Sequence, residues 1–143
     1  MRMKRALGAA AVMASAVAAL AVTQAEAQQP APAPSSLQAT SPGVSPSTGY
    51  APIYNDEGLI SCPSGSLCTS VWDPVRKKWR VDRFERCGTY DLSYWAGRGG
   101  FINNQTNGVE GRFIWEDGTA RVVSADNKSH GVTWDPYWKI KPC

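Results

Sequence analysis

The sequence predicts a single all-β domain of sandwich or barrel type, stapled by two disulfides and carried on an exported chain. From about residue 54 to Cys143, short stretches rich in β-branched and aromatic residues alternate with turn signals, which is the pattern of short antiparallel strands. Four cysteines in a small exported chain predict a disulfide framework. No window in this region carries a helical period long enough to compete with that interpretation.

The first 27 residues have the three parts of a secretory signal. Arg2, Lys4 and Arg5 form a basic start, an Ala-rich apolar run covers residues 6–22, and an Ala-x-Ala pattern ends at Ala27. We expect cleavage after Ala27; the alternative, an uncleaved anchor, is disfavoured because the run is short and weakly hydrophobic. Cleavage lowers Lys+Arg from 15 to 12 and Asp+Glu from 12 to 11, so the net charge falls from +3 to +1. This nearly neutral mature chain predicts neither a nucleic-acid partner nor a membrane partner.

Residues 28–53 are rich in Pro, Ala and Ser and contain little apolar mass. Such a segment buries too little surface to offset the entropy of ordering. We therefore predict a disordered spacer over 28–53 and a folded domain over 54–143.

Five stretches of the domain have strand character. They are residues 67–72, 79–84, 109–115, 119–123 and 137–140. Asp117-Gly118 lies between two of them and predicts a hairpin, because both residues tolerate positive φ. In the last stretch Trp138 and Ile140 alternate with lysines, which predicts that these two side chains share the buried face of a strand.

The cysteines Cys62, Cys68, Cys87 and Cys143 allow three disulfide connectivities. Pro63-Ser64-Gly65 can turn the chain back between the first two, which favours Cys62–Cys68 and leaves Cys87–Cys143. A metal site is disfavoured, because the spacing of the first pair is not a usual zinc spacing and exported thiols oxidise.

The residues with catalytic potential form no recognisable enzyme motif. The chain has one histidine, His130, in a turn-like segment without a nucleophile-elbow context. The carboxylates are scattered, and no spacing selects a glycosidase pair among them. Phosphate-binding loops and dinucleotide fingerprints are also missing from the sequence. We therefore expect a protein that is not an enzyme and needs no cofactor.

Six tryptophans make the domain strongly aromatic. Trp79, Trp115 and Trp138 lie in strand-like stretches and are expected in the core, because a small core needs large residues. Trp72, Trp95 and Trp134 lie beside turns and are the better candidates for exposure and ligand contact. The basic run at residues 76–78 is typical of a solvated turn.

A family resemblance appears in the cysteine-containing half of the domain. Cys62-Pro63-Ser64-Gly65-Ser66-Leu67-Cys68-Thr69 resembles the opening signature of a family of small secreted actinobacterial proteins. The stretch 87–92, Trp95 and the stretch 103–106 resemble that family as well. Its members are classed as peptidase inhibitors, and its type member inhibits metalloproteinases. The resemblance implies a single Greek-key β-sandwich, βγ-crystallin-like, with the first cysteine pair bridged locally.

Two segments, 103–107 and 126–130, are similar to crystallin-type calcium sites but place the hydroxyl one position early. Since calcium needs several convergent oxygens, we expect no bound calcium and no other metal.

The resemblance implies a secreted, monomeric inhibitor that presents a rigid loop to an extracellular protease. The candidate loops are residues 73–78, 97–100 and 103–108. The candidate binding residues are Trp72, Arg76, Lys77, Trp95, Arg98, Asn103, Asn104 and Thr106. Two alternatives stay open: a module that binds cell-wall or other polysaccharide through turn-adjacent tryptophans, and an antimicrobial or toxin-like protein on the same scaffold.

Overall fold

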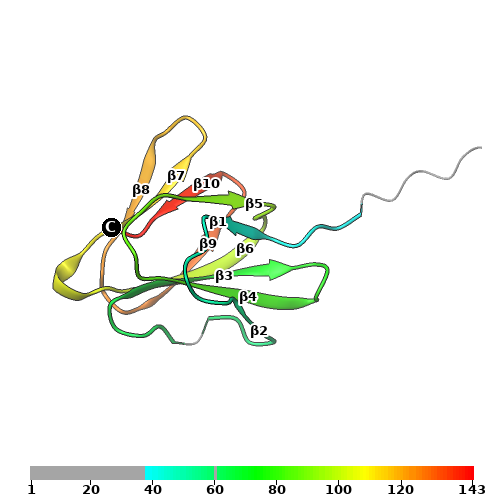
Figure 1. Ribbon diagram of the computed structural model, residues 1–143, viewed down its shortest axis with the longest axis horizontal. Coiled ribbons are helices and arrows are strands. Elements are labelled where there is room, and N and C mark those ends of the chain that lie inside the picture. The colour runs from blue at the N-terminus through cyan, green and yellow to red at the C-terminus, as the bar shows by residue number, and fades with distance from the viewer. Residues whose placement is uncertain (1–37, 60) are drawn as a thin grey trace, which may run out of the picture. The chain divides into compact units, whose positions relative to one another are not determined.

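Two antiparallel five-stranded sheets pack face to face in the computed structural model, which describes residues 38–59 and 61–143 (Figure 1). The predicted signal peptide and residues 28–37 of the predicted spacer lie outside the described residues. The strands are β1 (Gly43–Ser45), β2 (Ile53–Asn55), β3 (Ser66–Asp73), β4 (Lys78–Phe84), β5 (Tyr90–Ser93), β6 (Arg98–Asn104), β7 (Gly111–Trp115), β8 (Ala120–Val123), β9 (Ser129–Thr133) and β10 (Tyr137–Lys141). A single 3-10 turn, η1 (Thr106–Gly108), follows β6 in this part of the chain. The all-β sandwich predicted from the strand pattern is confirmed.

Most of the two sheets is built from two units of four consecutive strands, β3 to β6 and β7 to β10. Each unit places one of its strands in the sheet that holds the other three strands of the other unit. One sheet has the order β2-β4-β3-β6-β9 and the other β1-β5-β10-β7-β8. In each unit the first, second and fourth strands share a sheet, with the fourth beside the first. The third strand, β5 or β9, lies in the opposite sheet. Each unit is therefore joined to the other by strand pairing, β5 with β10 and β9 with β6.

The hairpin predicted around Asp117-Gly118 is confirmed as β7–β8, which pair with Phe113 opposite Arg121. Three further strands, β5, β6 and β9, lie outside the stretches that the sequence predicted as strands. Of these, β6 and β9 overlap segments that the sequence indicated as turns, and β6 is the inner strand that joins β3 to β9. Residues 98–100 lie within β6 rather than in a loop, so the predicted loop 97–100 is wrong for these three residues. The predicted loop 103–108 is likewise wrong for residues 103 and 104, which end the same strand.

The spacer prediction is wrong for residues 38–53, which the structure places in the domain. Gly43–Ser45 pairs antiparallel with β5, and Ile53 begins a strand that pairs with β4. We call residues 41–45 the strap. The strap is ordered by partners far along the chain, so its poor local apolar content does not determine its structure.

The core lies between the sheets and is mainly aromatic. Trp134, Phe113 and Phe84 are fully buried, and Trp95 packs edge-on against Trp134 with ring centroids 4.8 Å apart. The expectation of exposure is thus wrong for Trp95 and Trp134, which point inward from their turns and belong to the core cluster.

The prediction that Trp138 is buried is also wrong. Ile140 is buried as expected, but Trp138 is 51% exposed. The pairing of β10 with β7 shifts register between Tyr137 and Lys139, and such an irregularity turns a side chain away from the face that alternation predicts. Trp79 and Trp115, also expected in the core, are half-buried.

Both predicted disulfides are present. Cys62–Cys68 bridges two residues six apart in sequence, and Cys87–Cys143 joins the β4–β5 connection to the C-terminus. The second bond ties the chain passing between the sheets to the end of β10. Within residues 38–59 and 61–143, no helix is long and apolar enough to cross a membrane.

Candidate functional site

The turn that joins β3 to β4 is organised by one carboxylate. Oδ1 of Asp73, the last residue of β3, accepts hydrogen bonds from the backbone N–H groups of Val75 (2.9 Å) and Arg76 (3.1 Å). The N–H of Lys77 donates to the carbonyl oxygen of Asp73 at 2.8 Å, and Lys77 closes the turn with a φ of 53°. Aspartate suits this position because it caps the amides that follow, and the ring of Pro74 fixes the φ of Pro74 itself at a value that suits a turn. The backbone of residues 73–77 is therefore fixed locally.

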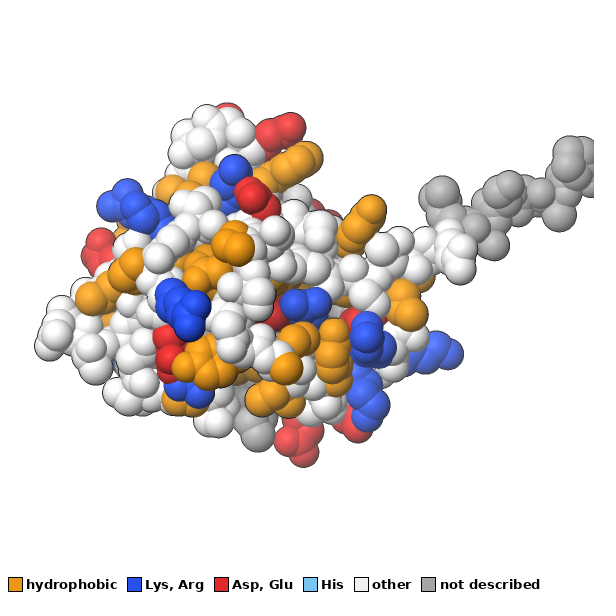
Figure 2. Space-filling view, in the orientation of Figure 1, with side chains coloured by type: hydrophobic (Ala, Val, Ile, Leu, Met, Phe, Trp, Pro, Cys, Tyr) orange, Lys and Arg blue, Asp and Glu red, His pale blue; other side chains and the backbone are white. Residues whose placement is uncertain are grey.

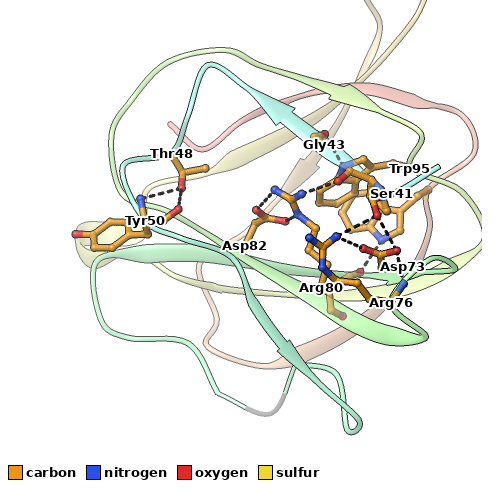
Figure 3. A network of polar contacts seen from close by, with 12 residues as sticks. Ser41, Gly43, Thr48, Tyr50, Asp73, Arg76, Arg80, Asp82 and Trp95 are labelled. Carbon is orange, nitrogen blue, oxygen red and sulfur yellow. Dashed lines mark hydrogen bonds and ion pairs between the residues drawn. The ribbon is translucent and has the colours of Figure 1, made fainter.

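Asp73 is also held from the strap. The hydroxyl of Ser41 donates to Oδ1 of Asp73 at 3.0 Å, and the guanidinium of Arg76 donates to both Oδ2 of Asp73 and the hydroxyl oxygen of Ser41 at 3.1 Å (Figure 3). The Asp73 side chain is fully buried, whereas that of Arg76 is half exposed. A buried carboxylate with these partners couples the turn to the strap.

The environment of Asp73 favours its charged form. Burial by itself raises the pKa of this carboxyl, because it disfavours the charge. The hydrogen bonds from the amides of Arg76 and Val75, the Ser41 hydroxyl and the Arg76 side chain more than offset burial, so the pKa lies below its ordinary value. The turn thus keeps a buried negative charge at neutral pH.

A second ion pair lies beneath the turn on the inner face of β4. Arg80 donates two hydrogen bonds to the carboxylate of Asp82, from Nε at 2.7 Å and from an Nη nitrogen at 2.8 Å. Its other Nη nitrogen donates to the carbonyl oxygen of Pro42 in the strap (Figure 3). Burial alone lowers the pKa of Arg80, but the adjacent Asp82 raises it above its usual value. The strap is therefore anchored to both strands of the hairpin.

The outer surface of the turn combines apolar and basic side chains. Val75 is 53% exposed, and Pro74 and Lys77 are exposed beside it. The Arg76 guanidinium lies over the ring of Tyr54, 4.5 Å from its centroid. At the foot of the turn, Trp72 packs edge-on against Trp79 with the ring centroids 5.6 Å apart, and Trp72 remains 41% exposed. The arrangement is a rigid projection with a small apolar tip and a cationic flank.

The structure brings three of the predicted binding residues, Trp72, Arg76 and Lys77, together at this turn. Trp95 lies apart and is buried, with its indole N–H donating to the carbonyl oxygen of Gly43 at 2.8 Å. Arg98 is exposed at the start of β6. Trp95 therefore supports the strap and is not the exposed side chain that the sequence predicted.

The two asparagines among the predicted binding residues, Asn103 and Asn104, donate hydrogen bonds to backbone carbonyl oxygens. Asn103 is fully buried, and its amide donates to the carbonyl oxygens of Val109 and Val123 at 3.1 and 2.8 Å. Asn104 donates to the carbonyl oxygen of Cys62 at 2.8 Å, which fastens the first disulfide loop to β6. Thr106 is exposed in η1. Asn103 and Asn104 thus hold connections in place.

His130 lies in β9 rather than in a turn. Its ring stacks on Phe101 with centroids 5.0 Å apart, and Nε2 is 2.9 Å from Oδ2 of Asp126. The described residues contain no cluster of three or more His, Cys, Asp or Glu side chains that could hold a metal ion. The imidazole of His130 thus has a hydrogen-bond partner in Asp126 and a packing partner in Phe101.

The sequence indicated part of this site and missed the rest. Asp-Pro at the end of a strand is a signal for a capped turn and marks residues 73–78 as a loop. Nothing in the sequence pairs Ser41 with Asp73, which lie 32 positions apart. Sequence reasoning also missed Val75. The available signal was that Val75 is an apolar residue directly before the basic run at residues 76–78.

The fold and the site define a disulfide-stapled β-sandwich with a rigid projecting hairpin turn. Comparison with protein-family models, with curated proteins and with solved structures finds no match to this chain.

Proposed function

We propose that this protein is an exported peptidase inhibitor that acts as a monomer by placing the rigid β3–β4 turn in the cleft of an extracellular protease. The observation that carries the proposal is the fully buried Asp73 carboxylate beneath an exposed Val75. A loop that is already ordered loses little conformational entropy on binding, which favours affinity. A rigid loop also resists the deformation that cleavage requires.

The chemistry of the turn indicates which proteases it suits. Val75 offers a small apolar side chain to an apolar specificity pocket, and Lys77 offers a cation to an acidic one. The Arg76 guanidinium is held by Asp73 and Tyr54 and so shapes the flank.

Two features support export and the family resemblance. Disulfides are typical of proteins that fold in oxidising compartments, in agreement with the signal-peptide pattern of residues 1–27. In each four-strand unit the fourth strand lies beside the first, as in a Greek key, although the third strand lies in the opposite sheet. The Greek-key, βγ-crystallin-like classification stays a prediction.

The test is inhibition of a protease panel by the chain purified from a secreting host. The panel contains a thermolysin-like, a subtilisin-like and a trypsin-like enzyme. We expect saturable inhibition of at least one member at micromolar concentration or below. Val75→Asp should weaken inhibition of an enzyme with an apolar pocket at least tenfold, and Lys77→Glu should do so for an enzyme with an acidic pocket.

Val122→Asp is the matched control, because Val122 is 48% exposed on β8, in the other sheet. This variant should inhibit like the wild type. Lack of inhibition across the panel, or equal potency of the wild type and both turn variants, would refute the proposal.

A further inference from the structure

We infer a second, separate binding site, for an uncharged glycan chain, at the end of the sandwich where three connections meet. These are the β5–β6 connection at residues 94–97, the β7–β8 connection at 116–119 and the β9–β10 connection at 134–136. The site is independent of the proposed protease contact, because the β3–β4 turn contributes none of its residues.

Two adjoining hollows form the site. The larger has a volume of about 710 Å³ and lies between the β7–β8 tip and β10; Trp115, Glu116, Asp117 and Thr119 line one side of it. The smaller, about 360 Å³, lies beside the β5–β6 connection and is lined by Tyr94. Asp135 and Trp138 line both hollows, so the surface is continuous across Trp138. Adjoining hollows on either side of a ring suit a chain of sugars better than a single sugar.

The aromatic side chains here are presented to solvent, whereas their sequence neighbours are buried. Tyr94 is 69% exposed and Trp138 is 51% exposed, while Trp95 and Tyr137 lie in the core. Exposed large aromatic side chains gathered at one place indicate a contact surface. Figure 2 shows hydrophobic side chains standing out beside acidic ones near the tip of the β7–β8 hairpin.

Backbone geometry sets the direction of these side chains. The register shift between Tyr137 and Lys139 directs Trp138 outward. Tyr94 adopts a φ of 59°, a left-handed conformation that is unfavourable for a bulky residue and is found where the surroundings impose it. Trp115 packs against Tyr137 with ring centroids 5.1 Å apart. Outward-facing rings of this kind can stack on the apolar C–H face of a sugar.

The polar groups around the rings match sugar hydroxyls. Glu116, Asp117 and Asp135 are carboxylates, which accept hydrogen bonds. Asp135 uses Oδ2 to accept the backbone N–H of Gly97 at 2.9 Å, which orients the group. Asp117 accepts hydrogen bonds from the hydroxyl and the N–H of Thr119, and these bonds lower its pKa and keep it charged. Hydroxyl donors of a glycan would complete the arrangement.

The charge of the site selects among glycans. Within the described part of the chain, the residues that line the two hollows include three carboxylates and neither Lys nor Arg. A polyanion such as a uronate polymer or a nucleic acid would be repelled. A neutral or N-acetylated chain presents apolar ring faces and hydroxyl donors without negative charge, so it fits the site.

The test measures binding of the full exported chain to insoluble chitin and cellulose, and titrates it with soluble N-acetylglucosamine and glucose hexamers by tryptophan fluorescence. We expect saturable binding to at least one of these neutral glycans and none to polygalacturonate. Trp138→Ala should weaken that binding at least tenfold, and Tyr94→Ala should weaken it severalfold. Tyr50→Ala is the control: this ring is also exposed but precedes β2 and lines neither hollow, so binding should be unchanged.

Thermal melting of each variant checks that the domain remains folded, and Asp135→Asn provides a second variant that keeps the shape of the site. Equal retention of the wild type and Trp138→Ala, or lack of binding to every neutral glycan, would overturn the inference. Preferred binding of polygalacturonate would overturn it as well. Loss of protease inhibition in Trp138→Ala would assign this surface to the protease contact instead, whereas loss of glycan binding alone leaves the proposed inhibitor function untouched.

Discussion

The hydroxyl of Ser41 donates a hydrogen bond to the buried carboxylate of Asp73, 32 residues further along the chain. This contact joins the strap to the turn that we propose as the protease contact. The strap continues to Gly43, whose carbonyl oxygen accepts the indole N–H of Trp95. One segment therefore stabilises the projecting turn and the connection that presents Tyr94.

Asp73→Ala is expected to destabilise the domain by about 2–4 kcal/mol, because it leaves two amide donors and the Ser41 hydroxyl without their acceptor. The free energy of unfolding in urea measures the effect. Asp56→Ala is the control: Asp56 pairs with Lys78, but its side chain is 78% exposed. A surface pair of this kind contributes at most about 1 kcal/mol. Equal losses from the two variants would contradict the role assigned to Asp73.

Acid should weaken the domain partly through Asp73. Because the pKa of this carboxyl is lower in the folded protein than its ordinary value of 3.8, its contribution to stability is complete above that ordinary pKa. The contribution is lost as the pH falls through the folded pKa. We expect the Tm of the wild type to drop more steeply below about pH 4 than that of Asp73→Asn. Calorimetry between neutral pH and about pH 2.5 tests this expectation, and parallel curves for the two proteins would contradict it.

Local sequence patterns predicted the strands whose residues are β-branched or aromatic and failed for strands made of turn-type residues. β3, β4 and the β7–β8 hairpin fall where the pattern placed them. β6 contains Gly99, Gly100, Asn103 and Asn104, which individually favour turns. Their place in a strand is set by groups on other strands, which a local pattern does not contain.

The same limit applies to side-chain direction. Trp134 stands beside Asp135-Pro136 and yet is fully buried, whereas Trp138 lies in a strand and is exposed. A buried hydrogen bond from the indole to the carbonyl oxygen of Ser70 and packing on Phe113 hold Trp134 inward, whereas a register shift turns Trp138 outward. For the turn, Asp73-Pro74 marked the loop, but the burial of the carboxylate depends on Ser41 and the strap.

Removing the Cys87–Cys143 bond is expected to cost about 4 kcal/mol. The bond joins residues 56 apart in sequence, and closing a loop of that length restricts the unfolded chain strongly. Cys87 is exposed and Cys143 is half-buried, so replacing both by alanine leaves no large cavity in the folded state. Urea denaturation of the double variant measures the loss. A loss below about 2 kcal/mol would indicate that the unfolded chain is already compact without the bond.

Gly99→Ala should destabilise the domain severely, because no side chain fits at this position. A Cβ atom there would lie 2.1 Å from the carbonyl oxygen of Ser70 and 2.2 Å from Nε1 of Trp134. These are the acceptor and donor of a buried hydrogen bond of 2.8 Å, so β3 or the central indole has to move. We expect a loss of about 3 kcal/mol or more, from overpacking together with the broken bond.

Gly131→Ala is the matched control for this substitution. Gly131 lies on β9 opposite Gly100, and a Cβ atom there meets nothing within 4 Å. Its φ, like that of Gly99, lies outside the left-handed range, so alanine requires no change of backbone conformation at either position. The control should stay within about 0.5 kcal/mol of the wild type in urea denaturation. Because the two glycines differ in the space around them, near-equal stability of the two variants would mean that Trp134 can be displaced from Ser70 without cost.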